Sequence, residues 1–538
     1  MRATKETSLP YSATAPTGKI SNDPLAWEFV RVARAHPRRP AMVDSTGREL
    51  TNRQLLAGAV CLAPLLRDVW RDDAMAVICL PPSVGGALAN FSASLVGKPV
   101  VNLNYTAPPS ILKSALEQCG SRHVLSSKHF LEKLGKEIPG EIIQLEDLGA
   151  RVRGWRRLAG ALRAWYWPIA SLRRSLRASA RASVEGELAT VIFSSGSTGE
   201  PKGVMQTHAN IRSNISSVAP LFRLGENERL LGVLPFFHST GYTYGLWAPL
   251  LTGMQAVYHA NPLDAKTIGE LVEKHGVTIL FATPTFLQTY ARRCTPQQFA
   301  SLRVAIAGAE KLSERVATIF REKFGLEPLE GYGCTETGPL VAINVPEKGG
   351  AKKGTVGRPL PDVEIRIVHP ETFVDFAPGE EGLVLVRGPN VMRGYLGSDN
   401  LTREAIRDGW YSTGDMGLLD RDGFLTITGR LARFSKLGGE MVPHVSVEEA
   451  LHRAYGGDEL CFAVTAVDDP QKGERLAVVH TLDEEQIDRV LERLANEDLP
   501  NLWIPRRNAF VRVDRIPLLG TGKLDLKGVK TLAQKALE

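Results

Sequence analysis

The sequence predicts an α/β fold, with a large N-terminal domain of layered sheets and helices, a β-rich subdomain, and a small mobile α+β C-terminal domain. Apolar runs rich in Val, Ile and Leu alternate with helical patterns, which is typical of strands buried on both faces of a sheet. After about residue 355 the runs become shorter and are bounded by turn residues. A length of 538 residues exceeds what one hydrophobic core supports, so two or more domains are expected.

In chain order, buried strands are predicted in five apolar runs: residues 74–82, 189–195, 229–236, 277–284 and 302–309. The β-rich subdomain is predicted from the runs 363–368 and 382–388, which have turn signals at their ends. Residues 1–25 are rich in Ser, Thr, Pro and Gly and are expected to be flexible. We expect the N-terminal domain to cover 26–431 and the mobile C-terminal domain to cover 432–538.

The composition argues against several classes of protein. A net charge of +6 is mild for this length, so no nucleic-acid partner is expected. The six cysteines lack metal-ligand and CxxC spacing, which suits a reducing compartment. The polar N-terminus has no signal core and no apolar run of about 18 residues is present, so no membrane span is predicted. We expect a cytoplasmic protein, with peripheral attachment to the inner face of the membrane as an option.

The strongest chemical signal is the string SSGSTGEPKG at residues 194–203, directly after an apolar run. Small residues let the backbone approach a polyphosphate, so that successive amides and hydroxyls can donate to its oxygens and a lysine can add positive charge. The spacing differs from that of a Walker A loop, and a Gly/Ser-rich surface turn is the simpler alternative. The expected phosphate-binding residues are Ser194, Ser195, Gly196, Ser197, Thr198, Gly199 and Lys202.

This string resembles the phosphate loop of the adenylate-forming superfamily, which contains acyl-CoA synthetases, luciferases and peptide-synthetase adenylation domains. The resemblance implies an enzyme that uses ATP and Mg²⁺ to activate a carboxylic acid as an acyl-adenylate. Further segments resemble the superfamily's motifs in the same order: LPFFHSTGY (234–242), GYGCTETGP (331–339), WYSTGD (410–415), GR (429–430) and LLGTGKLD (518–525).

The resemblance also implies roles for single residues in a reaction between two anions, which needs positive charge and a fixed in-line geometry. Lys523 would contact the carboxylate and the α-phosphate. Glu336, together with Thr198, would hold Mg²⁺. Asp415 would accept hydrogen bonds from both ribose hydroxyls, and Arg430 would assist at the ribose or the α-phosphate. The simpler alternatives are a surface lysine, a solvated glutamate and a turn-capping aspartate.

Other residues are implied to bind the nucleotide or the acid. Tyr332 would stack on adenine, and Thr335 would hydrogen-bond phosphate. His238, inside FFHSTG, would gate the acyl site or contact the carboxylate, with a buried core histidine as the alternative. The remaining nucleotide-binding candidates are Gly308, Ala309, Glu310, Gly331 and Gly333.

Three segments narrow the choice of acid and acceptor. VNLNYTA (101–107), AGAEKL (307–312) and GRLARFSKLGGEMVPH (429–444) resemble bacterial acyl-acyl-carrier-protein synthetases, including the synthetase part of the fused 2-acylglycerophosphoethanolamine acyltransferase/acyl-ACP synthetase. That resemblance implies a long-chain fatty acid as substrate and the phosphopantetheine thiol of holo-acyl carrier protein as acceptor. Coenzyme A is the alternative acceptor. An adenylate-handling or membrane-binding scaffold is the non-enzymatic alternative.

The C-terminal domain is implied to serve the second half-reaction. Lys436 matches the lysine that faces the site after this domain rotates, for thioester formation. Gly438 and Gly439 would line a narrow passage for pantetheine. Where the family often has Asp or Lys as the hinge, this chain has Ala432, which can still change its backbone dihedrals.

Residues 148–184 form an unusual insert with nine arginines and no acidic residue. Apolar residues recur there at three- and four-residue spacing, which predicts one apolar stripe on a basic helix that is kinked or split at Pro168. Peripheral membrane contact, docking of an acidic carrier protein and packing on the protein's own surface are all compatible with the pattern. The predicted stripe comprises Trp155, Leu158, Leu162, Trp165, Ile169, Leu172 and Leu176.

One motif indicates a different chemistry. His259 and Asp264 have the HxxxxD spacing of glycerophospholipid acyltransferases. Two residues at that spacing often occur by chance, and no Gly-Thr-Arg phosphate motif follows them, so this is the weaker interpretation.

Overall fold

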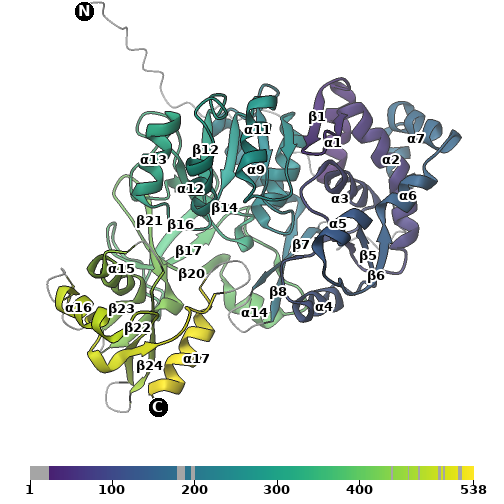
Figure 1. Ribbon diagram of the computed structural model, residues 1–538. Coiled ribbons are helices and arrows are strands. Elements are labelled where there is room, and N and C mark those ends of the chain that lie inside the picture. The colour runs from purple at the N-terminus through teal and green to yellow at the C-terminus, as the bar shows by residue number, and fades with distance from the viewer. Residues whose placement is uncertain are drawn as a thin grey trace, which may run out of the picture.

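Two large sheets form the N-terminal part of the molecule (Figure 1). The computed structural model describes residues 23–177, 188–195, 200–437, 440–457, 460–469, 473–494, 499–500, 503–518 and 524–537. Within these ranges the first sheet has nine strands, in the spatial order β15 (Arg358–Pro359), β14 (Leu340–Ile343), β13 (Leu329–Gly333), β12 (Val304–Ala307), β11 (Ile279–Ala282), β9 (Arg229–Gly232), β10 (Gln255–Tyr258), β1 (Pro40–Asp44) and β2 (Glu49–Thr51). The second has seven described strands, in the order β18 (Gly394–Tyr395), β8 (Pro201–Thr207), β7 (Leu188–Ser195), β4 (Val100–Asn102), β3 (Ala76–Ile78), β5 (His123–Ser126) and β6 (Glu141–Gln144).

Helices pack against these sheets, and several begin at side-chain caps of the kind that satisfies unpaired backbone amides. Thr51 and Thr207 each form a capping box, with Gln54 and Asn210 respectively. Among the described helices, none is both long enough and apolar enough to cross a membrane. The helices of this part are α1 (Leu25–Ala35), α2 (Asn52–Val69), α3 (Val84–Val96), α4 (Pro109–Gln118), α5 (Lys128–Leu134), α6 (Leu145–Arg151), α7 (Trp155–Tyr166), α8 (Ile169–Leu176), α9 (His208–Phe222), the π-helix η2 (Gly241–Trp247), α10 (Ala248–Thr252), α11 (Ala265–His275), α12 (Pro284–Arg293), α13 (Glu314–Phe324), the 3₁₀ helix η3 (Thr335–Thr337) and α14 (Asp399–Ala405).

The strands β11 and β12 show why continuous apolar runs predict strands that are buried on both faces. They pair in parallel, and all their residues are buried. Ile279 and Phe281 belong to one hydrophobic core, whereas Leu280 and Ala282 belong to another on the opposite face. Because successive side chains of a strand point to opposite faces, burial on both faces requires apolar residues at every position. The five predicted buried runs all contain a strand, so that prediction is confirmed.

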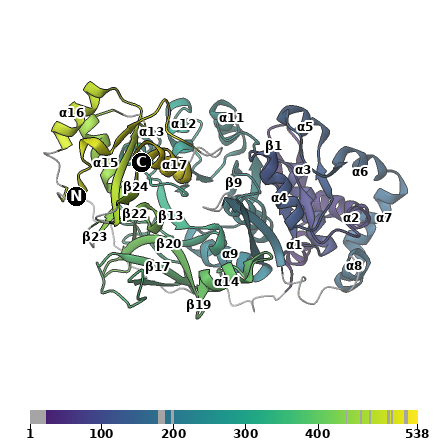
Figure 2. The same ribbon diagram turned by 90° about the horizontal axis from the view of Figure 1, so that it is seen from below.

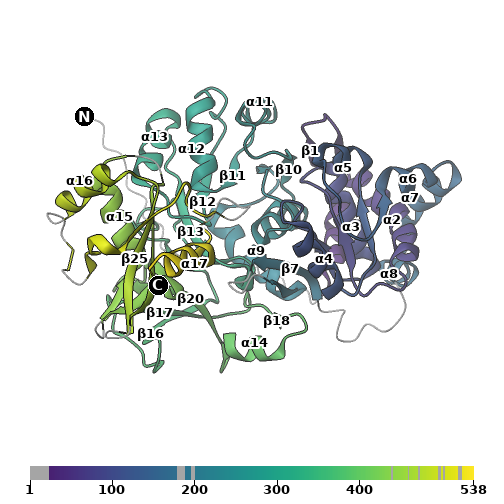
Figure 3. The ribbon, with the colours of Figure 1, turned by 60° about the horizontal axis from the view of Figure 1, so that its bottom comes forward.

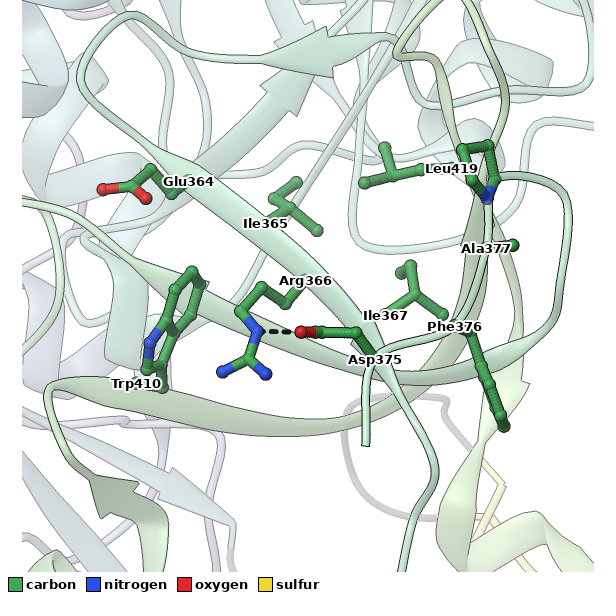
Figure 4. A pocket seen from close by; sticks show the side chains of 10 residues that line it. Glu364, Ile365, Arg366, Ile367, Asp375, Phe376, Ala377, Trp410 and Leu419 are labelled. Carbon is green, nitrogen blue, oxygen red and sulfur yellow. Dashed lines mark hydrogen bonds and ion pairs between the residues drawn. The ribbon is translucent and has the colours of Figure 1, made fainter. Parts of the chain in front are cut away.

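The predicted β-rich subdomain is present as an antiparallel sheet, which Figure 3 shows beside the C-terminal elements. Its outer surface has a depression of about 490 Å³ (Figure 4), where the Arg366 guanidinium donates to the Asp375 carboxylate and lies over the Trp410 ring. Trp410 is the only residue of the predicted nucleotide motifs among the residues that line this depression. The strands, in spatial order, are β16 (Glu364–Val368), β17 (Gly382–Arg387), β20 (Trp410–Leu419) and β19 (Ile406–Arg407), with β21 (Leu425–Arg430) paired to β20.

The C-terminal elements enclose hydrophobic cores of their own. One core includes Val447, Val464 and Val478, and a second includes Val479 and Val529. The domain boundary predicted at 431/432 falls within the 3₁₀ helix η4 (Leu431–Arg433). The elements are β22 (Phe434–Leu437), β23 (Glu440–Pro443), α15 (His444–Tyr455), β24 (Phe462–Asp469), β25 (Gly473–His480), α16 (Glu484–Leu494), the 3₁₀ helix η6 (Arg507–Ala509), β26 (Phe510–Arg512) and α17 (Leu526–Leu537).

Within residues 148–177, the part of the insert that the structure describes, α7 and α8 are separated at Pro168, as predicted. The predicted apolar stripe is divided there, because it faces the core in α8 and mainly outward in α7. In α8 the stripe residues Leu172 and Leu176 are buried in the main core. In α7 the buried residues are Gly160 and Ala164, while Trp155, Leu158 and Leu162 are exposed. The Cβ of any larger residue at 160 would lie 2.2 Å from Cys61 Sγ on α2. Close approach of two helix backbones therefore decides which side of α7 packs inward.

Candidate functional site

The hairpin of β7 and β8 carries the predicted phosphate loop. Ser194 pairs with Lys202, and Ser195 pairs with Pro201. The loop residues Gly196, Ser197, Thr198 and Gly199 lie outside the described residues. The Lys202 ammonium lies 5.5 Å from the centroid of the Tyr395 ring, on the neighbouring strand β18. This cation is thus fixed over an aromatic face at the base of the loop.

The carboxyl ends of β12 and β13 form a second wall of the site. These strands pair in parallel, so the residues after them meet at one edge of the sheet, which is where α/β sheets bind ligands. Gly308 follows β12, and Ala309 has a left-handed φ of 70°. Glu310 is exposed and accepts a 2.8 Å hydrogen bond from Thr285 Oγ1.

Glycines let β13 run close to the chain that returns as β14. A Cβ at Gly333 would stand 1.8 Å from the Pro339 carbonyl oxygen, so no other residue fits without a backbone shift. At Gly331 the nearest atom to such a Cβ is Leu340 Cδ1, at 3.1 Å. The predicted string GYGCTETGP therefore needs its glycine at 333 for a tight turn between two strands.

Asp415 is a buried carboxylate that accepts hydrogen bonds from two other side chains. Its side chain is only 6% exposed, and its backbone pairs with Arg430 across β20 and β21. Tyr332 Oη donates to Asp415 Oδ2 at 2.6 Å, and Arg430 Nε donates to Asp415 Oδ1 at 3.0 Å. The structure thus brings together three predicted nucleotide-binding residues from three strands.

Asp415 shifts the pKa values of the two side chains that donate hydrogen bonds to it. Burial and the nearby Asp415 carboxylate raise the pKa of the Tyr332 hydroxyl, so it remains a protonated donor. The same carboxylate raises the pKa of the Arg430 guanidinium. Each oxygen of a carboxylate has two lone pairs and can accept more than one hydrogen bond. The Arg430 side chain is 66% exposed, which leaves its remaining donors open to the site.

Glu336 is linked to the phosphate hairpin through Tyr395. Tyr395 Oη donates to Glu336 Oε1 at 2.9 Å, and the Lys202 ammonium lies over the Tyr395 ring. The carbonyl of Thr335 accepts from Gln206 Nε2 of β8 at 2.7 Å. These contacts hold the predicted metal ligand beside the strand that ends the phosphate loop. Sequence reasoning missed Tyr395 and Gln206.

His238 is exposed, so the alternative of a buried core histidine is wrong. Its ring centroid lies 4.6 Å from that of Phe237, and its carbonyl accepts from the amide of Tyr242. The π-helix η2 starts three residues later. A Cβ at Gly241 would be 2.0 Å from the Pro235 carbonyl oxygen, so glycine is required there. Single-turn π segments are frequent at functional sites.

The C-terminal contributors are only partly within the described residues. Lys436 lies in β22, where its backbone pairs with Met441. Lys523, Gly438 and Gly439 lie outside the described residues. Leu518 and Leu524, which flank the loop of Lys523, pair as an isolated antiparallel bridge.

The HxxxxD pair has a structural explanation. His259 Nε2 lies 3.5 Å from Asp264 Oδ2, but Asp264 caps α11 by accepting hydrogen bonds from the backbone and hydroxyl of Thr267. The Thr267 hydroxyl lowers the pKa of Asp264, as expected for a cap. Capping accounts for this aspartate without an acyltransferase role.

A family profile described as AMP-binding enzyme matches residues 29–396. The chain is 29% identical to the 2-succinylbenzoate–CoA ligase of Bacillus licheniformis, over 91% of this chain and 96% of that protein. It is 34% identical to a feruloyl-CoA synthase of Amycolatopsis, over 64% of this chain and 69% of that protein. It is also 31% identical to the long-chain-fatty-acid–CoA ligase of Bacillus subtilis, over 63% of this chain and 61% of that protein.

The fold is similar to solved structures of the same kind of enzyme. The o-succinylbenzoate CoA synthetase of Bacillus subtilis, in complex with an acyl-adenylate intermediate, superposes with a TM-score of 0.76 and 26% identity, over 94% of this chain and 98% of that one. A structure of that synthetase with ATP and magnesium gives a TM-score of 0.73 and 26% identity, over 93% of this chain and 98% of that one.

Proposed function

The chain belongs to the AMP-binding enzyme family, and from that membership we propose that it is a long-chain fatty acid ligase that forms an acyl-adenylate and transfers the acyl group to holo-acyl carrier protein. Enzymes of this family use ATP with Mg²⁺, and the relatives named above are acid–CoA ligases. The observation that carries the first half of the proposal is the buried carboxylate of Asp415, which accepts hydrogen bonds from Tyr332 and Arg430.

The described residues fit the nucleotide. Asp415 is a two-oxygen acceptor held in one orientation, which suits a pair of ribose hydroxyls. Arg430 lies next to it with donors available for a phosphate or ribose oxygen. Gly308, Ala309, Glu310, Gly331 and Gly333 would flank the base, with Tyr332 beside it and Thr335 toward the phosphates. The hairpin of Ser194, Ser195 and Lys202 would hold the phosphates.

The described residues also fit a magnesium ion bound with a nucleotide. Among them, no group of three or more His, Cys, Asp or Glu side chains could hold a metal alone. Mg²⁺ is usually bound by one or two carboxylates together with substrate phosphates and water, and Glu336 supplies one carboxylate. Tyr395 would orient that carboxylate. Bound there, the ion would offset charge on the leaving pyrophosphate.

Three further residues of the chain would act on the acid and on the acyl transfer. Lys523 would neutralise the approaching carboxylate and the α-phosphate, so that two anions can meet in line. His238, exposed next to η2, would border the acid. Lys436, in the C-terminal domain, would serve the thioester step after that domain rotates.

Different observations support the proposed acid and the proposed acceptor. A long-chain acid is supported by the Bacillus subtilis long-chain-fatty-acid–CoA ligase among the relatives. The carrier protein is supported by the resemblance of residues 101–107, 307–312 and 429–444 to acyl-carrier-protein synthetases. Coenzyme A is the second candidate acceptor, because the relatives named above are CoA ligases.

The test measures acceptor choice with ATP, Mg²⁺ and palmitate. We expect thioester formation and AMP release with holo-acyl carrier protein to exceed those with coenzyme A. Apo-carrier protein, which lacks the thiol, is the matched control and should yield no thioester. A preference for coenzyme A would replace the proposed acceptor, and absence of palmitate-dependent pyrophosphate exchange would refute the long-chain acid.

A further inference from the structure

The outward face of α7 carries large apolar side chains that are about half or more exposed to solvent. The exposed fractions are 74% for Trp155, 64% for Leu158, 49% for Leu162 and 79% for Tyr166. These residues recur at three- and four-residue spacing, so they share one side of the helix. Gly160 and Ala164, on the opposite side, are buried. The apolar side therefore faces directly away from the protein, and we call these four residues the α7 face.

Contacts from α1 and α2 hold α7 in place. Arg34 Nε of α1 donates to the Ala164 carbonyl at 2.8 Å, and Arg34 Nη2 donates to the Trp167 carbonyl at 2.9 Å. Cys61 Sγ of α2 lies 3.7 Å from the Arg157 carbonyl oxygen. The α7 face is thus presented by a fixed helix and cannot fold back onto the core without breaking these contacts.

Arginines lie along one flank of α7 and directly before its N-terminus. Arg151, Arg153, Arg156 and Arg163 are all exposed, and the insert from 148 to 184 has no acidic residue. The Arg163 guanidinium lies 5.1 Å from the centroid of the Trp167 ring. Aromatic and leucine side chains beside arginines match the boundary between lipid headgroups and acyl chains.

From this juxtaposition we propose that the α7 face is a docking surface for an anionic lipid bilayer, on which the enzyme sits as a peripheral protein. The proposal goes beyond the ligation reaction and does not depend on which thiol accepts the acyl group. The apolar residues would enter the headgroup region, and the arginines would contact lipid phosphates.

Two other occupants fit the geometry less well. A carrier protein must bring its thiol to the reacting site, whereas α7 lies at the end of the molecule remote from the C-terminal elements (Figures 1 and 2). A second copy of this chain would bring the same arginines face to face in a symmetric dimer, which costs repulsion. A bilayer on this side would also leave the C-terminal domain unobstructed.

The experiment is co-sedimentation of the full chain with vesicles of phosphatidylglycerol or of phosphatidylcholine. We expect binding to phosphatidylglycerol that weakens as salt rises, and far weaker binding to phosphatidylcholine. Changing Arg156→Gln and Arg163→Gln together should weaken binding by about fivefold per arginine. Changing Trp155→Ser, Leu158→Ser and Leu162→Ser together should weaken binding by more than about tenfold.

Matched controls use side chains of similar exposure elsewhere. Leu263→Ser with Val374→Ser removes apolar surface that is 59% and 63% exposed. Arg292→Gln with Arg293→Gln removes two exposed charges from α12. Both control pairs should bind vesicles as the wild type does, and thermal melts should show every variant folded.

Three results would overturn the proposal. The first is failure of the wild type to sediment with phosphatidylglycerol, and the second is equal loss of binding in the controls. The third is a concentration-dependent dimer, or a complex with carrier protein, that the α7 variants abolish while vesicle binding is unchanged. The acceptor assay keeps this result separate from the ligase proposal, because all α7 variants should retain turnover with soluble palmitate.

Discussion

The nucleotide side of the N-terminal domain, which we call the body, differs from the C-terminal domain in how its functional residues are held. In the body, the buried Asp415 is fixed by Tyr332, from β13 of the nine-stranded sheet, and by Arg430, from β21 beside its own strand. The C-terminal domain has separate cores, and across the boundary an exposed pair joins Lys311 to Glu449 of α15 at 2.8 Å. We infer that nucleotide binding is preorganised, whereas Lys436 and Lys523 belong to a part that can rotate as a unit.

The largest expected effect separates binding from chemistry. Lys523→Ala should slow palmitate-dependent pyrophosphate exchange by about a hundredfold to a thousandfold, because a cation placed on the developing charge is lost. ATP affinity, measured by calorimetry, should change little, because in this proposal the body would supply the nucleotide contacts. Lys527→Ala, an exposed lysine in α17, is the matched control and should keep full activity. Retained exchange, or lost ATP binding, would contradict the division between the two regions.

The next effect tests the body itself. Asp415→Ala should weaken ATP binding by about a hundredfold, since hydrogen bonds to a charged acceptor are each worth about 1.5 kcal/mol or more. The wild type should bind deoxy-ATP more weakly than ATP. The Asp415→Ala variant should bind the two nucleotides equally, because the acceptor for the hydroxyl is already gone.

Asp420→Ala provides the control for Asp415, because Asp420 follows the same strand but pairs with Lys352 at 2.5 Å outside the site. Its affinity for ATP should be unchanged. An Asp415 variant that still discriminates against deoxyribose would show that the ribose is held elsewhere.

A smaller effect is expected at the link between the metal ligand and the phosphate hairpin. Tyr395→Phe removes the donor to Glu336, so the Mg²⁺ concentration for half-maximal activity should rise by about tenfold. Tyr290→Phe is the matched control, because its hydroxyl donates to the Pro262 carbonyl at 2.8 Å outside the site. Equal Mg²⁺ requirements for the two variants would remove Tyr395 from the proposed metal site.

The sequence predicts the fold and the motifs because both depend on local patterns. Continuous apolar runs mark strands such as β11 and β12, and compact strings mark Asp415 and Glu336. Tyr395 could not be found this way, because its role depends on β18 pairing with β8 about 190 residues earlier. The outward direction of the apolar stripe in α7 could not be predicted for a related reason. Periodicity identifies a helix side but not its direction, and close approach at Gly160 turned the small side inward.

The smallest expected effect concerns one exposed ion pair between the two regions. The Lys311–Glu449 pair is exposed, at 75% and 45%, so it should stabilise the described arrangement of the domains by no more than about 1 kcal/mol. With fluorescent labels on α13 and α16, Lys311→Ala should lower the ratio of this arrangement to others by up to about fivefold.

Lys353→Ala supplies the comparison, because Lys353 makes a similar exposed pair with Glu314 at 2.7 Å inside the body. Loss of the Lys353–Glu314 pair should leave the distance between the labels on α13 and α16 unchanged. Raising salt should shift the wild type toward the Lys311→Ala distribution and leave that variant unaffected, because exposed pairs are screened. If Lys311→Ala and Lys353→Ala behave alike, the domains are held by something other than this pair. The body and the C-terminal domain would then be more tightly coupled than their separate cores indicate.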